Sequence, residues 1–134
     1  MAFFRKLLYG SGLSYNREEL SEMATDYEYS GKFDDAIRCM KIIIKKDPKD
    51  SNAYGRIGNI LLYRLKQPAE SIEYFDKVIQ LVPLSKWGWS HKGTALYLMG
   101  KNDEAIVCFE YYMDYECQQI GFQWEDICKM YISF

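Results

Sequence analysis

The chain has 134 residues, of which 49% are hydrophobic, 27% are charged and three are proline, so it can bury one elongated core in a single domain. Its 17 basic and 19 acidic residues give a formal net charge of −2, and the basic ones are scattered along the sequence. We therefore expect no nucleic-acid partner. No apolar stretch is long enough to predict a membrane span.

The first residues are predicted to form an N-terminal cap segment, residues 1–16, that folds onto the rest of the domain. Phe3, Phe4 and Leu7 make an apolar helical stripe, which a glycine-rich turn at residues 10–12 interrupts. A secretory signal would need a longer apolar centre and a small-residue cleavage site. Two alternatives stay open: self-association or groove docking through this stripe, and a weak membrane-surface anchor.

Six amphipathic helices are expected after this segment. Asn16 stands three residues before Glu19, which is the spacing of a capping box, and Pro48 and Pro83 each follow a helix that a proline would end. The apolar periodicity gives helices over residues 17–30, 33–46, 51–64, 68–81, 86–99 and 103–116. These signals predict an all-α fold.

A short pattern returns three times within these helices. It consists of a small residue, then isoleucine, then methionine or phenylalanine three residues later, and it begins at Ala36, Ser71 and Ala105. The separations are 35 and 34 residues, counted from those positions. A period of this length is typical of helical repeat proteins.

Small residues also recur on the first helix of each unit, where they would let two helix backbones approach closely. The first-helix residues Ala24, Gly58 and Gly93 would face Ala36, Ser71 and Ala105, with Tyr27, Phe75 and Phe109 filling the flanking space. This pattern resembles the tetratricopeptide repeat. The resemblance implies a right-handed α-solenoid of three helix pairs plus a C-terminal capping helix, with repeats 17–50, 51–85 and 86–119 and the cap at 121–134 inside a domain of 17–134.

The departures from the family pattern are local. The second unit has one more residue between its two small residues than the first, and we place this insertion in the turn Leu65–Pro68. Cys117 stands where the third unit should carry proline. In the capping helix, Met130, Ile132 and Phe134 add apolar surface where a free end should be polar. We expect these three residues to be covered, either in an oligomer contact with a second copy or with the N-terminal stripe of another chain, or by further repeats of a longer array.

The resemblance also implies a functional surface, because this family reads its partners on the concave wall formed by the first helices. That wall is expected to be a polar trough with aromatic positions, and Trp87 is the best single candidate for a binding anchor, whereas Trp89 and Tyr27 are assigned to the core. The proposed groove residues are Tyr29, Asn52, Arg56, Asn59, Tyr63, Trp87, His91, Thr94 and Tyr97.

One subclass of the family clamps the terminal carboxylates of heat-shock chaperones with lysine, asparagine and arginine side chains. The matching places in this chain carry Ser21, Thr25, Arg56, Trp87 and His91. With only isolated basic groups at these places, a carboxylate clamp is not expected.

Neither a catalytic nor a metal site is predicted. His91 is the only histidine, no glycine-rich phosphate loop is present, and the four cysteines form no CxxC pair. We expect no cofactor and a reduced, cytoplasmic setting. The leading hypothesis is a non-enzymatic protein–protein interaction module that binds an extended peptide or partner helix, acting as an adaptor. The alternative is a self-assembling scaffold that forms a homo-oligomer through its apolar ends.

Overall fold

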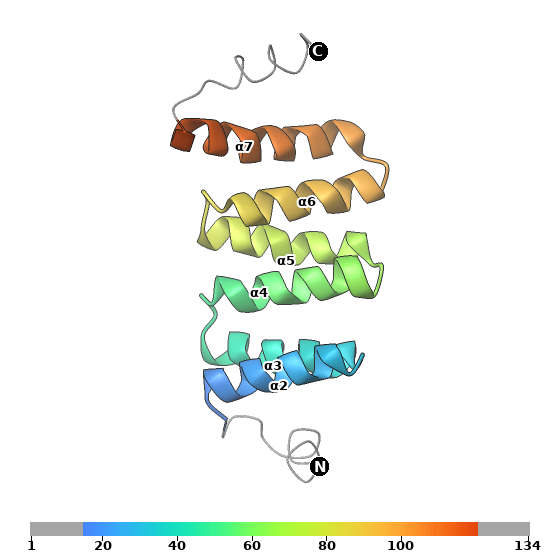
Figure 1. Cartoon of the computed structure of the whole chain (residues 1–134), viewed down its shortest axis with the longest axis vertical. Coiled ribbons are helices and arrows are strands. Elements are labelled where there is room, and N and C mark those ends of the chain that lie inside the picture. Colours follow the sequence, from blue (N-terminus) through green and yellow to red (C-terminus); the bar gives the residue numbers. More distant parts are fainter. Residues whose placement is uncertain (1–14, 121–134) are drawn as a thin grey trace.

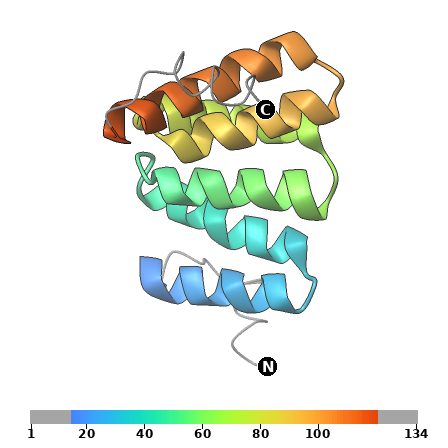
Figure 2. The ribbon, with the colours of Figure 1, turned by 45° about the horizontal axis from the view of Figure 1, so that its top comes forward.

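The computed structural model describes residues 15–120, and this part of the chain is a stack of helices (Figure 1). The helices lie across the long axis of the stack, with α2 at one end and α7 at the other, and successive helices run in opposite directions. Figure 2 shows the same stack turned by 45°. The helices are α2 Arg17–Tyr29, α3 Phe33–Lys46, α4 Ser51–Asn59, the π-helical segment η2 Ile60–Arg64, α5 Pro68–Leu81, α6 Lys86–Leu98 and α7 Asn102–Ile120. The predicted all-α fold of three helix pairs is confirmed.

Side-chain caps fix where the first helix of each pair begins. Asn16 and Glu19 form the predicted capping box, in which each side chain accepts a hydrogen bond from the other residue's backbone N–H at 2.8 Å. At the start of α4, Asp50 Oδ1 accepts a hydrogen bond from the N–H of Ala53 at 3.1 Å. At the start of α6, Ser85 Oγ accepts one from the N–H of Gly88 at 3.2 Å. These caps satisfy backbone donors that a helix start leaves without a partner.

The extra residue of the second unit lies in the helix rather than in the turn where it was predicted. The helix that begins as α4 widens into η2, where the N–H of Leu65 donates to the carbonyl of Ile60 at 3.0 Å. A π-type turn takes up one residue without breaking the helix. The turn itself keeps the geometry of the other two units, because Lys66 has a φ of 56° where Gly31 and Gly100 have 74° and 78°.

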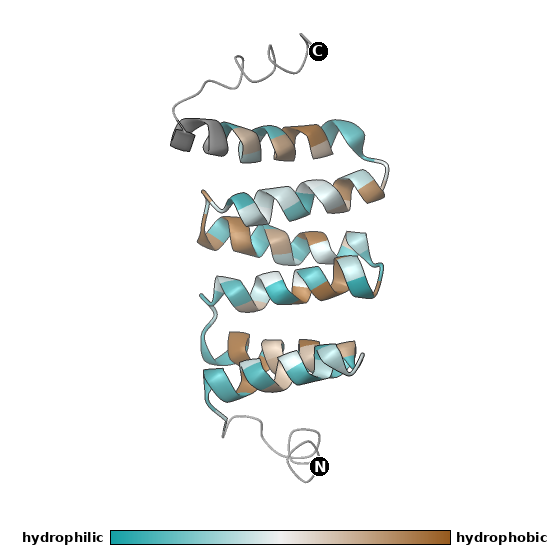
Figure 3. Ribbon diagram, in the orientation of Figure 1, coloured by the Kyte–Doolittle hydropathy of each residue, from teal (hydrophilic) through white to brown (hydrophobic). Residues whose placement is uncertain are grey.

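Close contacts between small and large residues hold each helix pair together. A Cβ added to Gly58 would lie 2.7 Å from Cε1 of Phe75, and one added to Gly93 would lie 2.8 Å from Cε1 of Phe109. Both distances are too short for a real Cβ contact, so only glycine allows these rings their positions. The register assigned from the repeat is therefore correct at these two pairs. Figure 3 shows hydrophobic and hydrophilic residues alternating around the helices, as in amphipathic helices.

Two expectations about the third unit need correction. Trp89 was assigned to the core but is only partly buried and packs at the edge of a core cluster: its ring stacks on Tyr111 of α7 at 4.5 Å, and its Nε1–H donates to the carbonyl of Pro83 at 3.0 Å. The helix α7 runs to Ile120, four residues beyond its predicted end at 116. No proline interrupts it where Pro48 and Pro83 follow α3 and α5.

The predicted capping helix 121–134 and the segment 1–14 lie outside the described residues, as do the oligomer-contact residues Phe3, Phe4, Leu7, Met130, Ile132 and Phe134. Among residues 15–120, no helix has the length and apolar character needed to cross a membrane.

One ion pair links the start of α2 to the start of α4. Arg17 Nε donates to Asp50 Oδ2 at 2.5 Å, and this hydrogen bond holds the pKa of the Asp50 carboxyl below its ordinary value. A depressed carboxyl pKa stabilises the folded state above the unfolded pKa of about 4, and this stabilisation is lost as the pH falls through the folded pKa.

We predict that Asp50→Asn, which keeps an oxygen to cap α4, lowers the free energy of unfolding at pH 7 by about 1 kcal/mol. The difference from the wild type should shrink as the pH falls from about 4 through the lowered pKa of the folded Asp50 carboxyl, because the unfolded wild type takes up a proton first. Urea unfolding followed by circular dichroism across this pH range measures it. A difference that stays constant with pH would mean that the ion pair contributes nothing to stability.

Candidate functional site

Arg56 of α4 is bound to α2 rather than left open on the groove wall. Its guanidinium donates to Ser21 Oγ at 2.9 Å, to Thr25 Oγ1 at 3.1 Å and to a Glu28 carboxylate oxygen at 2.7 Å. Because the Arg56 side chain is 23% exposed and paired with an acid, it cannot be offered to a ligand without breaking these contacts. Arg56 therefore links the first helices of two successive pairs.

Two repeat positions on α2, α4 and α6 change character along the stack. Both positions lie on the side of the first helix that faces away from its buried small residue. The position six residues before the small residue carries Glu18, Asn52 and Trp87, and the position two residues before it carries Glu22, Arg56 and His91. On α2 the two glutamates are exposed. The same wall is therefore acidic on α2 and aromatic on α6.

The aromatic end is a cluster of four rings from three helices. Trp87 and His91 of α6 lie 4.6 Å apart between ring centroids, and each contacts the fully buried Phe75 of α5 at 5.8 and 5.6 Å. Tyr63 of η2 adds its hydroxyl, which lies 2.6 Å from His91 Nδ1. The π-helical turn thus contributes a ring to the groove, since Tyr63 lies within it.

The Trp87 ring packs against α4 at Gly55, where no side chain stands in its way. A Cβ added to Gly55 would lie 2.2 Å from this ring, so the indole lies directly on the helix backbone. Trp87 is 37% exposed, which makes it a partly covered wall of the groove rather than a free side chain. An aromatic side chain held on one face and open on the other is a rigid contact for a partner.

Burial lowers the pKa of His91 below its ordinary value. The imidazole is therefore neutral at pH 7, and one of its nitrogens is shared with the Tyr63 hydroxyl. A neutral histidine adds no charge to this end of the groove. The aromatic end is consequently uncharged as well as apolar.

A pocket of about 330 Å³ opens beside Trp87, at the first turns of α4 and α6. Trp87 and Val78 supply its apolar surface, and the remaining lining residues are polar. The lining residues are Ser51, Asn52, Arg56, Val78, Ser85 and Trp87. The pocket thus has an aromatic wall and several polar side chains, a combination that suits a peptide side chain together with its backbone.

The nine groove residues expected from the sequence are not all in one place. The pocket brings together Asn52, Arg56 and Trp87, and the ring cluster joins Tyr63 and His91 to Trp87. Tyr29 and Tyr97 stand apart and are 89% and 62% exposed.

The two remaining groove residues and the unpredicted contacts complete the site. Thr94 donates to the carbonyl of Ser90 in its own helix at 3.0 Å. The Asn59 side-chain oxygen is buried and accepts no hydrogen bond from the described residues 15–120. Sequence reasoning missed Val78 and Glu28, because neither lies at a first-helix position that the family reads.

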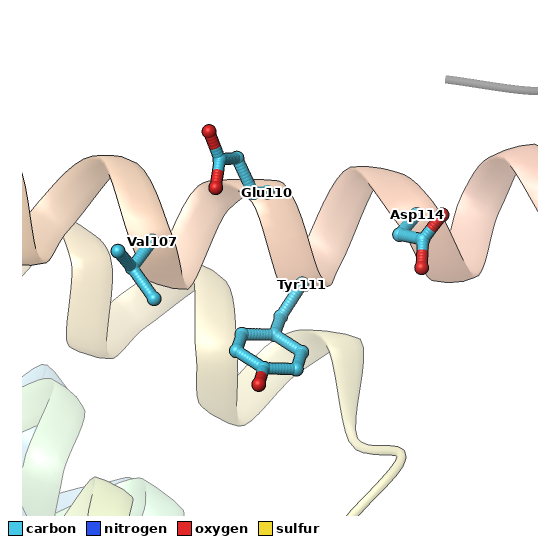
Figure 4. Close-up of a pocket in the computed structure, with 4 residues that line it drawn as sticks. All are labelled: Val107, Glu110, Tyr111 and Asp114. Carbon is cyan, nitrogen blue, oxygen red and sulfur yellow. The ribbon is translucent and has the colours of Figure 1, made fainter. Parts of the chain in front are cut away.

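A second pocket, of about 460 Å³, lies on α7 (Figure 4). The four described residues that line it project from successive turns of this helix, and Tyr111 lies toward α6, where it stacks on Trp89. Ile106 and Val107 are about half exposed, at 53% and 49%. The outer face of α7 therefore carries apolar side chains.

The described residues hold no group of three or more histidine, cysteine, aspartate or glutamate side chains able to bind a metal ion. Cys39 and Cys108 are buried free thiols. Burial raises the pKa of Cys39 to about 11, so this sulfur stays protonated and unreactive at neutral pH.

Comparison with known proteins agrees with the fold. The family model described as "Tetratricopeptide repeat" matches residues 21–86. Hsp70-Hsp90 organizing protein 2 of Arabidopsis thaliana is 29% identical over 93 residues, which are 69% of this chain and 16% of that protein. The chain therefore spans only a small part of this relative.

Solved structures with the same architecture include two groups of proteins. The first TPR of Spaghetti (RPAP3) bound to the HSP90 peptide SRMEEVD has a TM-score of 0.68 and 24% identity, covering 75% of this chain and 79% of that one. MamA has a TM-score of 0.75 and 18% identity, covering 89% of this chain and 65% of that one. Together with the family match and the helix-pair contacts, these likenesses identify the chain as a tetratricopeptide repeat protein.

Proposed function

We propose that the chain is a non-enzymatic protein-interaction module that binds an extended peptide or a partner helix in the groove lined by α2, α4 and α6. The observation that carries this proposal is the pocket between α4 and α6, where Trp87 forms a rigid apolar wall beside the polar side chain of Asn52. The likeness to a repeat domain that holds a peptide supports the same reading.

An adaptor role in a reducing, cytoplasmic compartment belongs to this proposal. It accords with the free thiols of Cys39 and Cys108. It also accords with the family, whose members bind partners on the same wall. Asn52 contributes an amide that can both donate to and accept from a peptide backbone.

Trp87→Ala tests the proposal. We expect it to weaken binding of a groove partner by about 2 kcal/mol or more, because the pocket loses its largest apolar surface. The partner is obtained by pull-down from native cell extract and mass spectrometry, and its binding segment is then measured as a synthetic peptide by titration calorimetry. Some stability is lost too, since Trp87 contacts Phe75 and His91.

Trp89→Ala is the matched control. This tryptophan lies on the same helix but contacts Tyr111 of α7, so its removal should lower stability and leave the affinity of the folded protein unchanged. Equal losses of affinity in both variants, or none in Trp87→Ala, would show that the groove is not the binding surface.

The runner-up function is a self-assembling scaffold, proposed to associate through contact residues near the two ends of the sequence that lie outside the described residues. Within residues 15–120, Ile106 and Tyr111 of α7 are 53% and 57% exposed. Exposed apolar side chains of this kind favour association. Size-exclusion chromatography with light scattering separates the two functions: a monomer at all concentrations supports the module, and a concentration-dependent oligomer supports the scaffold.

A further inference from the structure

We propose that the groove selects a peptide with cationic residues at one end and an aromatic or branched aliphatic residue at the other. The cationic end would lie along α2, and the apolar residue would sit in the pocket beside Trp87. This inference rests on the proposed function and names the chemistry of the partner. Such a peptide is opposite in charge to the acidic SRMEEVD sequence bound by the similar repeat domain.

The pocket sets the apolar end of the peptide. Its two apolar walls, Trp87 and Val78, come from α6 and α5, while Ser51, Asn52 and Ser85 leave hydrogen-bonding groups at its edge for a backbone. The neighbouring His91 is neutral and shared with Tyr63. An apolar side chain gains from burial here, whereas a carboxylate would lose its hydration beside Arg56, whose charge is already paired with Glu28.

Arg56, the cation in the lining of the pocket, is already engaged by side chains of α2. It pairs with Glu28 at 2.7 Å, and its guanidinium also donates to Ser21 and Thr25. An acidic peptide that bound Arg56 would have to compete with Glu28 for it.

Exposed carboxylates supply the complementary charge at the other end. Glu18 and Glu22 lie one turn apart on α2, three residues before Ser21 and Thr25 respectively, and these two residues contact Arg56. Both glutamates therefore flank the α2 face that meets α4. Neither forms an ion pair within residues 15–120, so their charge is available to steer and orient a cationic segment.

The test is a selection of phage-displayed short random peptides on the wild-type protein and on two charge-reversed variants. Glu18→Lys with Glu22→Lys changes the groove, and Glu70→Lys with Glu73→Lys is the matched control on α5. Each pair combines two exposed glutamates, one of them in the first turn of its helix. A consensus peptide from the wild-type selection and the SRMEEVD peptide are then titrated against all three proteins.

We expect the wild type and the α5 control to select peptides with lysine or arginine at one end and an aromatic or aliphatic residue at the other. The α2 variant should bind the consensus peptide about tenfold more weakly, with a reduced dependence on salt. Acidic consensus sequences, tight binding of SRMEEVD, or equal losses in both charge-reversed proteins would overturn the inference while leaving groove binding intact. The same selection is also run on Trp87→Ala, and undiminished enrichment there would instead overturn the proposed function itself.

Discussion

Replacing Phe75 by alanine should lower the free energy of unfolding by about 3–5 kcal/mol, the largest loss expected among the fully buried side chains that the structure describes. Phe75 is completely buried and packs against the backbone of Gly58 in α4 and against the rings of Trp87 and His91 in α6. Its ring thus joins two successive helix pairs, and its removal leaves a cavity that these helices cannot close. Chemical unfolding followed by far-ultraviolet circular dichroism measures the loss.

Phe109→Ala is the control for this prediction. Phe109 occupies the same repeat position in the third unit and packs on Gly93, but it is only partly buried. We expect a clearly smaller loss, because less apolar area returns to water. Equal losses at the two positions would mean that burial does not distinguish them and that Phe75 has no special role between the pairs.

Gly58→Leu should destabilise the protein by about 1–3 kcal/mol or more through overpacking. A Cβ at this position already lies 2.7 Å from the Phe75 ring, and this ring has no exposed side toward which it can move. Leucine has a higher helix propensity than glycine by roughly 1 kcal/mol, which offsets only part of the clash. The melting temperature and the urea midpoint should both fall.

Gly93→Leu makes a useful comparison, since it introduces the same side chain against Phe109 at 2.8 Å. Phe109 is partly exposed and can shift outward, so a smaller loss is expected there. An unchanged melting temperature in both variants would contradict the helix contacts assigned to these glycines.

The repeat spacing was sufficient to predict the helix pairs and their closest contacts. The small residues predicted that Gly58 and Gly93 lie where two helices approach closely, with Phe75 and Phe109 beside them. The structure adds that each glycine lies directly against its ring. The caps at Asn16 and the helix starts followed from local rules that depend on a few neighbouring residues.

The position of the extra residue in the second unit was not predictable in the same way. A turn and a π-type widening both accommodate one residue, and the choice between them depends on how the whole helix packs against α5. In the other two turns a glycine adopts the left-handed conformation, whereas in the second turn Lys66 does so. Without a glycine at this position, the regular length of the turn could not be recognised from the sequence.

The groove was predicted as a surface but not as a set of contacts. Periodicity places Trp87 and Trp89 on different faces of α6, yet how far each is covered depends on Gly55 and on the neighbouring helix. The hydrogen bonds of Arg56 to Ser21, Thr25 and Glu28 depend on a long side chain turning toward α2, and spacing carries no information about that rotamer.

The stacking order of the helices also determines how the molecule would respond to force. The main contacts join sequential elements, from α2 with α3 through to α6 with α7, so tension applied along the stack passes through the interfaces in series. In such an arrangement the weakest interface yields first, and the remaining pairs keep their packing. We therefore expect the array to extend in steps under load, and the hydrogen bonds of Arg56 to α2 would have to break at one of those steps.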